Sequence, residues 1–324
     1  MKKFLAILII ICCLFALVGV LSACSESNWN NGNLKIVTTI FPEYDWTLNI
    51  LGEHSQEVNI INLLNSGVDM HSYQATVADI SYIATCDLLI YVGGESDIWV
   101  EDALKQAKNK NMVVVKLLDV VRDSVLDEDD KDGMQGEEDH DHDDETEHDE
   151  HVWLSLKRAQ TIVNAIADAL KKLDLDNADD YAANAESYCK QLDKLDGEYQ
   201  QALSTAANKT LIVADRFPFL YLFNDYGLDY YAAFSGCSAE TEASFETISF
   251  LVQKVNELQV KVIIKTETGK NDIPQTIINN SQNKNQKILT LNSLQSINGK
   301  DRANGVTYLS LMQSNLEVLR EAVA

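Results

Sequence analysis

The chain has 324 residues, with 26 Lys and Arg against 50 Asp and Glu, a formal net charge of −24 and 46% hydrophobic residues. This length allows two lobes that each bury a core, and hydrophobic runs recur from end to end, which excludes a disordered chain. A protein that binds nucleic acid through its phosphates is excluded as well, because no stripe of Lys and Arg is present.

The first 23 residues predict an export signal. Met1 is followed by two lysines, an apolar run over residues 4–20 and small residues up to Cys24. This order is typical of a signal peptide; an uncleaved anchor helix is the alternative, since about seventeen apolar residues are marginal for a membrane span. Residues 24–33 are polar and are expected to form a flexible tether.

The cysteines divide into one candidate for lipidation and three others. Leu-Ser-Ala-Cys at residues 21–24 resembles the bacterial lipobox, in which the cysteine is acylated and becomes the mature N-terminus. The resemblance implies that Cys24 is lipidated and that the mature protein is extracytoplasmic, anchored by lipid to the cell membrane. Cys86, Cys189 and Cys237 are too few for a disulfide framework and lack the C-x-x-C spacing of a zinc knuckle.

Short β-rich runs alternate with amphipathic helical patterns after the tether. Such alternation predicts parallel sheets covered by helices on both faces. We expect strands at residues 34–40, 58–64, 88–92, 113–118, 210–214, 228–234, 261–266 and 288–291. Helical patterns begin near Tyr44, Ala75 and Ile98 and cover residues 219–226, 245–258, 273–280 and 305–322. The fold class is therefore α/β, with two lobes that each hold a mostly parallel sheet flanked by helices.

A helical segment at residues 155–207 separates an N-terminal lobe, 34–154, from a C-terminal lobe, 208–324. Its second helix, expected at residues 178–206, has apolar residues at three- and four-residue steps and so one apolar face about forty ångströms long. These residues are Tyr181, Ala185, Tyr188, Leu192, Leu195, Tyr199 and Leu203. The pattern predicts a long rigid helix joining the lobes. A coiled-coil dimer seam is the alternative, but packing within a monomer is favoured for one short stretch.

Residues 127–150 differ in composition from the rest of the chain. They contain 15 Asp or Glu, one Lys and three His, so about −14 of the net charge of −24 lies in this segment. Like charges repel, and we expect a solvated loop insertion outside any core. The loop is either a solvated spacer or, because His140, His142 and His148 lie among carboxylates, a segment suited to weak capture of a divalent cation.

Two further histidines are candidates for a metal site. His71 follows a predicted strand and precedes a predicted helix, at the edge of a parallel sheet where α/β folds bind ligands. His151 lies between the acidic loop and the helix that begins near residue 155. Either residue alone is more often structural than a ligand.

The segments around these histidines resemble a known family. Residues 68–76, Val-Asp-Met-His-Ser-Tyr-Gln-Ala-Thr, are similar to the Val-Asp-Pro-His-Ser-Tyr-Glu-Pro-Thr segment of the zinc- and manganese-binding lipoproteins of bacterial ABC transporters (cluster A-I). Residues 150–155, Glu-His-Val-Trp-Leu-Ser, are similar to their Pro-His-Val-Trp-Leu-Ser segment. The resemblance covers essentially the whole mature chain, and an acidic loop with histidines is typical of the zinc branch. It implies one metal ion between two α/β lobes joined by a long helix, with His71 and His151 as ligands.

The chain departs from this family in the C-terminal lobe. Ala214 stands where a His or Glu ligand is expected, and Asn292 stands where an Asp or Glu is expected. Two imidazoles leave a four-coordinate ion half ligated. Asp215 and Glu267, each at the end of a predicted strand, are our candidates for the missing ligands.

Structural roles compete with these carboxylate assignments. Asp215 is equally suited to an ion pair with Arg216 or to a helix cap, and Glu267 to an exposed strand end. Glu240 and Glu242 are expected to be capping or surface groups.

The resemblance implies a receptor that captures a divalent transition metal, passes it to the membrane permease of an ABC importer and catalyses no reaction. Zn²⁺ is favoured by the histidines; Mn²⁺ or Fe²⁺ is the alternative for two imidazoles with one or two carboxylates. A surface zinc-dependent hydrolase and an adhesin are the other classes considered. The H-E-x-x-H, G-x-S-x-G and P-loop motifs are absent from the sequence, which disfavours a hydrolase or an ATPase.

Overall fold

The computed structural model describes residues 29, 32–129, 131–135, 148–238 and 242–324. Within these residues, eight strands form two four-stranded sheets in which all neighbouring strands are parallel. The strands are β1 (Lys35–Thr38), β2 (Asn59–Asn62), β3 (Leu88–Tyr91), β4 (Val113–Lys116), β5 (Thr210–Arg216), β6 (Asp229–Phe234), β7 (Val262–Thr266) and β8 (Lys287–Leu291). The predicted α/β fold with two parallel sheets is confirmed.

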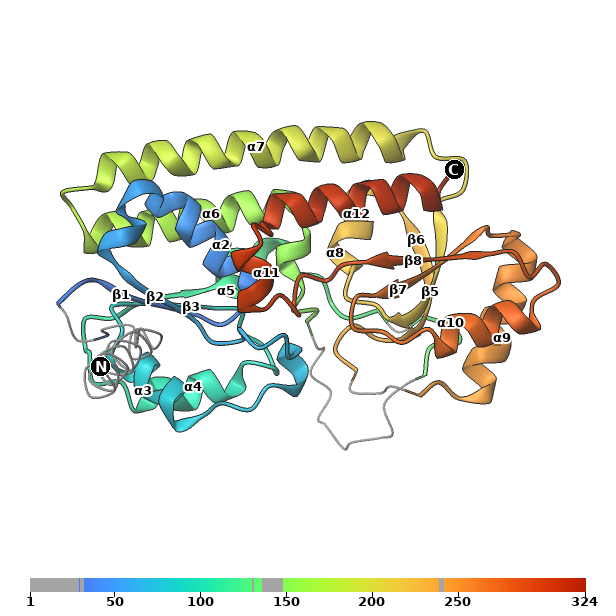
Figure 1. Cartoon of the computed structure of the whole chain (residues 1–324), viewed down its shortest axis with the longest axis horizontal. Coiled ribbons are helices and arrows are strands. Elements are labelled where there is room, and N and C mark those ends of the chain that lie inside the picture. The colour runs from blue at the N-terminus through green and yellow to red at the C-terminus, as the bar shows by residue number, and fades with distance from the viewer. Residues whose placement is uncertain (1–28, 30–31, 130, 136–147, 239–241) are drawn as a thin grey trace, which may run out of the picture.

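The N-terminal sheet has the strand order β2-β1-β3-β4 and helices on both of its faces (Figure 1). The helices of this half are α2 (Phe41–Leu51), α3 (Val77–Thr85), α4 (Ile98–Lys105) and α5 (Leu117–Val120), with 3-10 turns η1 (Gly52–Glu57), η2 (Met70–Ser72), η3 (Arg122–Ser124) and η4 (Val152–Leu154). All four residues of β3 are buried, as expected for a strand in the middle of a doubly covered parallel sheet.

The C-terminal sheet has the equivalent order β6-β5-β7-β8. Its helices are α8 (Leu220–Tyr226), α9 (Phe245–Leu258), α10 (Asp272–Asn280), α11 (Gly299–Ala303) and α12 (Tyr308–Ala322). Successive residues of β5 alternate between the two faces: Leu211 and Val213 join the main hydrophobic cluster, whereas Ile212 and Ala214 join a second cluster with residues of α9 and α10.

The long helix α7 (Ala178–Ser204) runs across both lobes, above α6 (Leu156–Leu173) and α12 (Figure 1). Its buried residues are the seven predicted from the periodicity: Tyr181, Ala185, Tyr188, Leu192, Leu195, Tyr199 and Leu203. All seven belong to one cluster that contains core residues of both sheets. The apolar face of α7 is therefore covered within this chain, without a coiled-coil partner.

Polar contacts reinforce this shared core where the lobes meet. The Trp153 indole donates a hydrogen bond to the Ser293 carbonyl at 2.9 Å, and the Tyr308 hydroxyl donates to the Trp153 carbonyl at 2.7 Å. The Tyr221 hydroxyl donates to the Asp149 carbonyl at 2.7 Å. Trp153, Tyr221 and Tyr308 are fully buried, so these hydrogen bonds are shielded from water and hold the segment before α6 against the C-terminal lobe.

The ends of the acidic segment 127–150 are ordered and contact the C-terminal lobe, which corrects the expectation of a wholly solvated loop. Gln135 forms a bridge with Phe234 of β6, and Lys131 forms an ion pair with Asp229. Asp149 and Glu150 are only 1% and 2% exposed. Their burial is possible because both carboxyl groups accept hydrogen bonds from backbone amides, as shown below.

Several predicted features lie outside the described residues: the export signal, Cys24, His140, His142 and Glu240. Among the described residues, no helix combines the length and the apolar character needed to cross a bilayer.

Glu43 is a buried acid at the start of α2. Its Oε2 accepts hydrogen bonds from the amides of Thr39 and Ile40 at 2.8 and 3.2 Å, whereas Oε1 has no partner. Burial, and then the neighbouring Asp97 carboxylate, raises the pKa of Glu43 from 4.5 to about 8. The folded protein therefore holds this proton over a pH range in which the unfolded chain has lost it.

We predict that Glu43 makes the free energy of unfolding decrease as pH rises from about 4.5 to about 8. In this window the folded state binds the extra proton, so the slope contributed by Glu43 approaches about 1.4 kcal/mol per pH unit. Glu43→Gln should remove this contribution, as measured by urea unfolding across the window. Glu53→Gln, at an exposed position of the same lobe, is the control. A wild-type pH slope in Glu43→Gln would contradict the assignment.

Candidate metal centre

His71 is held by a short 3-10 turn at the edge of the N-terminal sheet. Met70, 2% exposed, anchors the turn in the core, and the Asp69 side chain accepts a hydrogen bond from the His71 amide at 3.0 Å. The preceding Gly67 has φ +78°, and a Cβ there would lie 3.1 Å from the Ser296 carbonyl of the C-terminal lobe. A glycine is thus required both by the backbone conformation and by this close approach.

His151 is fully buried at the start of η4. The Asp149 carboxylate accepts a hydrogen bond from the His151 amide at 2.8 Å and lies 3.1 Å from its Nδ1. A carboxylate that receives Nδ1–H fixes the tautomer, so the lone pair of neutral His151 is on Nε2.

The two histidines, 80 positions apart in the sequence, meet where the lobes join. Their Nε2 atoms are 3.3 Å apart. Two nitrogen ligands at 2.0–2.1 Å from a tetrahedral zinc are separated by about 3.3 Å. The spacing of the pair is therefore that of two adjacent ligands of one ion.

Ser96 controls the other nitrogen of His71, because its hydroxyl lies 2.6 Å from Nδ1. A hydroxyl can donate or accept. When Ser96 donates, the Nε2–H of His71 can donate to His151. When Ser96 accepts from Nδ1–H, the Nε2 lone pair of His71 is free for a metal.

The electrostatic surroundings of the two imidazoles are opposite. Burial and then the nearby His151 lower the pKa of His71 to about 3. Burial also disfavours the charged form of His151, but the Asp149 carboxylate outweighs it and raises the pKa of His151 above 6.5. The low pKa keeps the His71 imidazole uncharged in neutral solution, whereas Asp149 favours protonation of His151.

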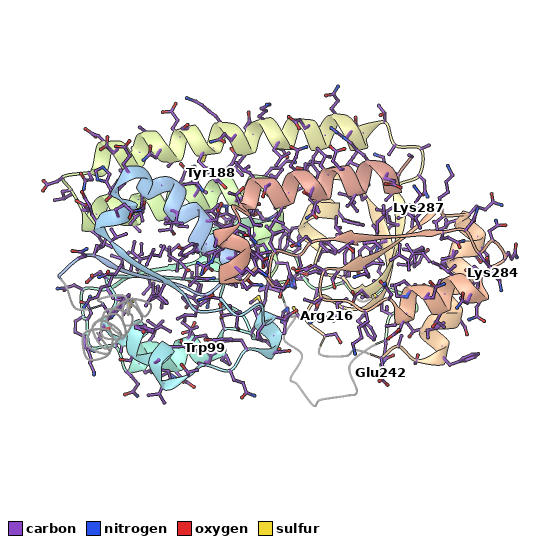
Figure 2. All side chains as sticks on the ribbon, in the orientation of Figure 1. Trp99, Tyr188, Arg216, Glu242, Lys284 and Lys287 are labelled. Atoms are coloured by element: carbon purple, nitrogen blue, oxygen red, sulfur yellow. The ribbon has the colours of Figure 1, made fainter. Side chains whose placement is uncertain are left out.

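An ion pair joins the lobes beside the histidines. Arg216, at the end of β5, lies between the lobes (Figure 2) and its Nη2 contacts Asp69 Oδ2 at 2.6 Å. Burial disfavours ionisation of Asp69, but Arg216 and His71 lower its pKa overall. Asp69 also accepts the hydrogen bond of the His71 amide, so it links the Arg216 guanidinium to the turn that carries His71.

The structure directs Asp215 away from the histidines. Its Oδ2 accepts hydrogen bonds from the amide and hydroxyl of Thr266 at 2.9 and 2.7 Å, and a Cβ on Gly269 would overlap this oxygen. Asp215 lines a pocket of about 490 Å³ on the C-terminal lobe, together with Arg216 and Glu242, and neither histidine belongs to that lining. Glu242 is exposed, as expected, while Ser244 caps α9.

Glu267 and the two departures from the family pattern also have structural contacts. Glu267 accepts hydrogen bonds from the amide and hydroxyl of Ser293, both at 2.8 Å, and from the Ser296 hydroxyl at 3.0 Å. Asn292 accepts a hydrogen bond from the Leu294 amide at 2.8 Å. Ala214 is buried in the second cluster, beneath α9 and α10. Ligation by Asp215 and Glu267 stays a prediction.

Two residues that the sequence did not identify lie beside His71. Ligand atoms of His71, Glu150 and Cys237 are all within 4.8 Å of one another, the one such group of three or more His, Cys, Asp or Glu found among the described residues. Burial raises the pKa of Glu150 to about 7 and that of the Cys237 thiol well above 9. The signal for Cys237 was its place just after a strand that pairs with β5, at the same carboxyl edge.

Two α/β lobes with a continuous helical connection and a histidine pair between them define a class of two-lobed solute-binding proteins. The family model described as zinc-uptake complex component A, periplasmic (ZnuA), matches residues 36–322. The chain belongs to this family.

Known relatives agree with this assignment. The zinc-binding lipoprotein AdcA of Streptococcus pneumoniae R6 is 31% identical over 325 residues, covering 99% of this chain but 61% of AdcA. The high-affinity zinc uptake system protein ZnuA of Bacillus subtilis is 29% identical, with 99% of this chain and 98% of that protein covered. The structure of the Zn(II)-bound ZnuA-like domain of S. pneumoniae AdcA has a TM-score of 0.71 at 27% identity and covers 90% of this chain and 99% of that one. This chain thus spans about three-fifths of AdcA and nearly all of the Bacillus protein.

We predict that Gly236→Ala destabilises the contact between the lobes. A Cβ at Gly236 would lie 2.9 Å from the Phe217 carbonyl and 3.1 Å from His151 Cε1, so the free energy of unfolding should fall by about 1–3 kcal/mol through overpacking. The matched control is Gly197→Ala in α7, where a Cβ meets nothing within 4 Å and helix propensity should add about 0.5–1 kcal/mol. Equal effects in urea unfolding would contradict the close packing at Gly236.

Proposed function

We propose that this chain is the zinc-binding lipoprotein of an ABC importer, which captures Zn²⁺ between its lobes and delivers it to a membrane permease. The observation that carries the proposal is the pair of Nε2 atoms 3.3 Å apart, contributed by two segments that a shared core holds together. The names of AdcA and ZnuA as zinc-binding or zinc-uptake proteins support zinc as the cargo.

His71 and His151 are the proposed ligands, and Ser96 and Asp149 orient their rings through Nδ1. Hydrogen bonds of this kind fix the ring orientation and increase the basicity of a metal-binding histidine. Imidazole ligands also accept Mn²⁺ or Fe²⁺, but intrinsic affinities at a nitrogen site favour zinc over manganese. Asp215 and Glu267 remain candidate ligands, although either must first release hydrogen bonds made within the C-terminal lobe.

The cellular role follows from the same proposal. The ion is exchanged intact, so no reaction is catalysed. Acylation of Cys24 would hold a monomer on the outer side of the cell membrane, near its permease. His140, His142 and His148 are proposed to collect cations for the interlobe site; His148, which is exposed, has its Nδ1 2.8 Å from Asp127 Oδ1.

We predict that His71→Ala and His151→Ala each lower zinc affinity by at least about a hundredfold, because each removes one of the ligands of a four-coordinate ion. Competition against a chromophoric chelator, together with elemental analysis of the purified protein, measures the loss. His54→Ala is the control, because the His54 ring is hydrogen-bonded to Glu57 and Asp180 and not to either site histidine. Unchanged metal content in both site variants would contradict the ligand assignment.

We also predict that zinc affinity falls as the solution becomes more acidic. The pKa of His71 is lowered to about 3, so its imidazole stays uncharged in the tested range, whereas the raised pKa of His151 makes His151 the group at which protons compete with zinc. Below that pKa each pH unit should cost at least about tenfold in apparent affinity, from the proton of His151 alone. Calorimetric titration from about pH 5 to 8 tests the slope; constant affinity over this span would exclude imidazole ligation.

A further inference from the structure

The proposed function leaves two positions of a tetrahedral ion to the candidates Asp215 and Glu267, and a group of residues around His71 offers an alternative. Glu150 immediately precedes His151, and Cys237 follows β6 in the opposite lobe. One ligand atom from each of His71, Glu150 and Cys237 lies within 4.8 Å of the other two. The group therefore combines both lobes with the histidine that the function already uses.

Glu150 is a buried acid in which only one of the two carboxyl oxygens has a hydrogen-bond partner. It is 2% exposed, and Oε1 accepts a hydrogen bond from the Ser96 amide at 3.0 Å. Oε2 is buried without a hydrogen-bond partner. Burying a carboxyl oxygen without a partner costs free energy, and ligation of a cation would offset that cost.

The loop that carries Cys237 is held against the histidines from several sides. The Cys237 amide donates to Glu128 Oε1 at 3.1 Å, and Arg216 Nη1 donates to the Ser238 carbonyl at 3.4 Å. A Cβ on Gly236 would lie 3.1 Å from His151 Cε1. The absence of a side chain at Gly236 thus lets the backbone reach His151 and brings the next residue, Cys237, to the site.

We propose that Glu150 and Cys237 complete the zinc site. His71 is shared by this group and by the histidine pair, and on binding the four side chains converge on one ion held by two imidazoles, one carboxylate and one thiolate. This inference rests on the proposed function and names the ligands of the same site. On binding, the Zn–S bond forms as the thiol releases its proton to solvent. A carboxylate and a thiolate balance the two charges of Zn²⁺, which leaves a neutral centre in a buried position.

Cys237 would supply the ligand from the C-terminal lobe that Ala214 and Asp215 do not. Ala214 faces the second cluster, and Asp215 is hydrogen-bonded to Thr266. Cys237 instead extends from the end of β6, the strand adjacent to β5 in the sheet. A soft sulfur ligand also favours zinc over the harder Mn²⁺, so the preference for zinc would reside largely in this residue.

The test uses Co²⁺ as a spectroscopic probe in the full mature chain. Wild-type protein should show an intense sulfur-to-cobalt charge-transfer band in the near ultraviolet and the visible bands of tetrahedral cobalt. Cys237→Ser should lose the charge-transfer band, bind zinc at least about tenfold more weakly and discriminate less between zinc and manganese. Glu150→Gln should weaken zinc binding and retain the band.

Cys189→Ser is the matched control, because Cys189 is the other partly exposed cysteine and contacts Asn164 and Gln160 of α6. Asp215→Asn and Glu267→Gln are measured beside these variants, because they report whether the C-terminal carboxylates bind the ion in place of Cys237. Should Cys237→Ser fail to fold, alkylation of wild-type protein replaces it: zinc should slow modification of Cys237 and leave Cys189 unchanged.

The outcomes separate the two proposals. Two results would overturn the ligand set and leave the zinc-receptor function in place. The first is a wild-type protein that binds zinc tightly but whose cobalt spectrum lacks the thiolate band. The second is a Cys237→Ser protein with wild-type zinc affinity. A loss of affinity in Asp215→Asn or Glu267→Gln larger than in Cys237→Ser would overturn the ligand set in favour of those carboxylates. A wild-type protein that binds neither zinc nor cobalt would overturn both proposals.

Discussion

Burial of the segment from Asp149 to Ser155 between the lobes is the constraint on which the rest of the structure depends. The segment packs against the C-terminal lobe. The Trp153 indole donates a hydrogen bond to the Ser293 carbonyl, and the Tyr308 hydroxyl donates one to the Trp153 carbonyl. An imidazole in such a place has to be satisfied by protein groups, and Asp149 supplies the partner for Nδ1. The anchoring that packs the lobes together therefore also sets the direction of Nε2 of His151.

Two buried acids beside this segment have raised pKa values. Asp97 and Glu150 are almost completely buried, and burial raises the pKa of each, to about 6 and about 7. Raised values of this kind reflect the cost of ionising a carboxyl group away from water. A divalent cation beside Glu150 would favour the ionised carboxylate, so this buried acid suits the proposed cargo.

The sequence predicted the architecture well because periodicity reports burial directly. Strands and helices were located by alternation and by three- and four-residue steps, and the seven buried residues of α7 are those of its predicted apolar face. His71 and His151 were found through a resemblance in short segments, and the structure brings their rings together.

The ligands of the C-terminal lobe were harder to predict, because the direction of a side chain at a strand end depends on local geometry. The pairing of β5 with β6 shifts between Val213 and Arg216, and Asp215 within this irregularity faces Thr266. Cys237 lies 86 positions from His151, and only the tertiary structure reveals that Gly236 brings its loop against the ring. Spacing rules for cysteines, which consider neighbours in sequence, cannot detect such a residue.

The single core shared by both lobes limits how the lobes can move. Trp153, Tyr199 and Tyr308 belong to one cluster that contains residues of both sheets. Separating the lobes as rigid bodies would expose these side chains to water, and the lost burial would cost several kcal/mol. The lobes are therefore expected to keep their relative positions while side chains outside this cluster rearrange.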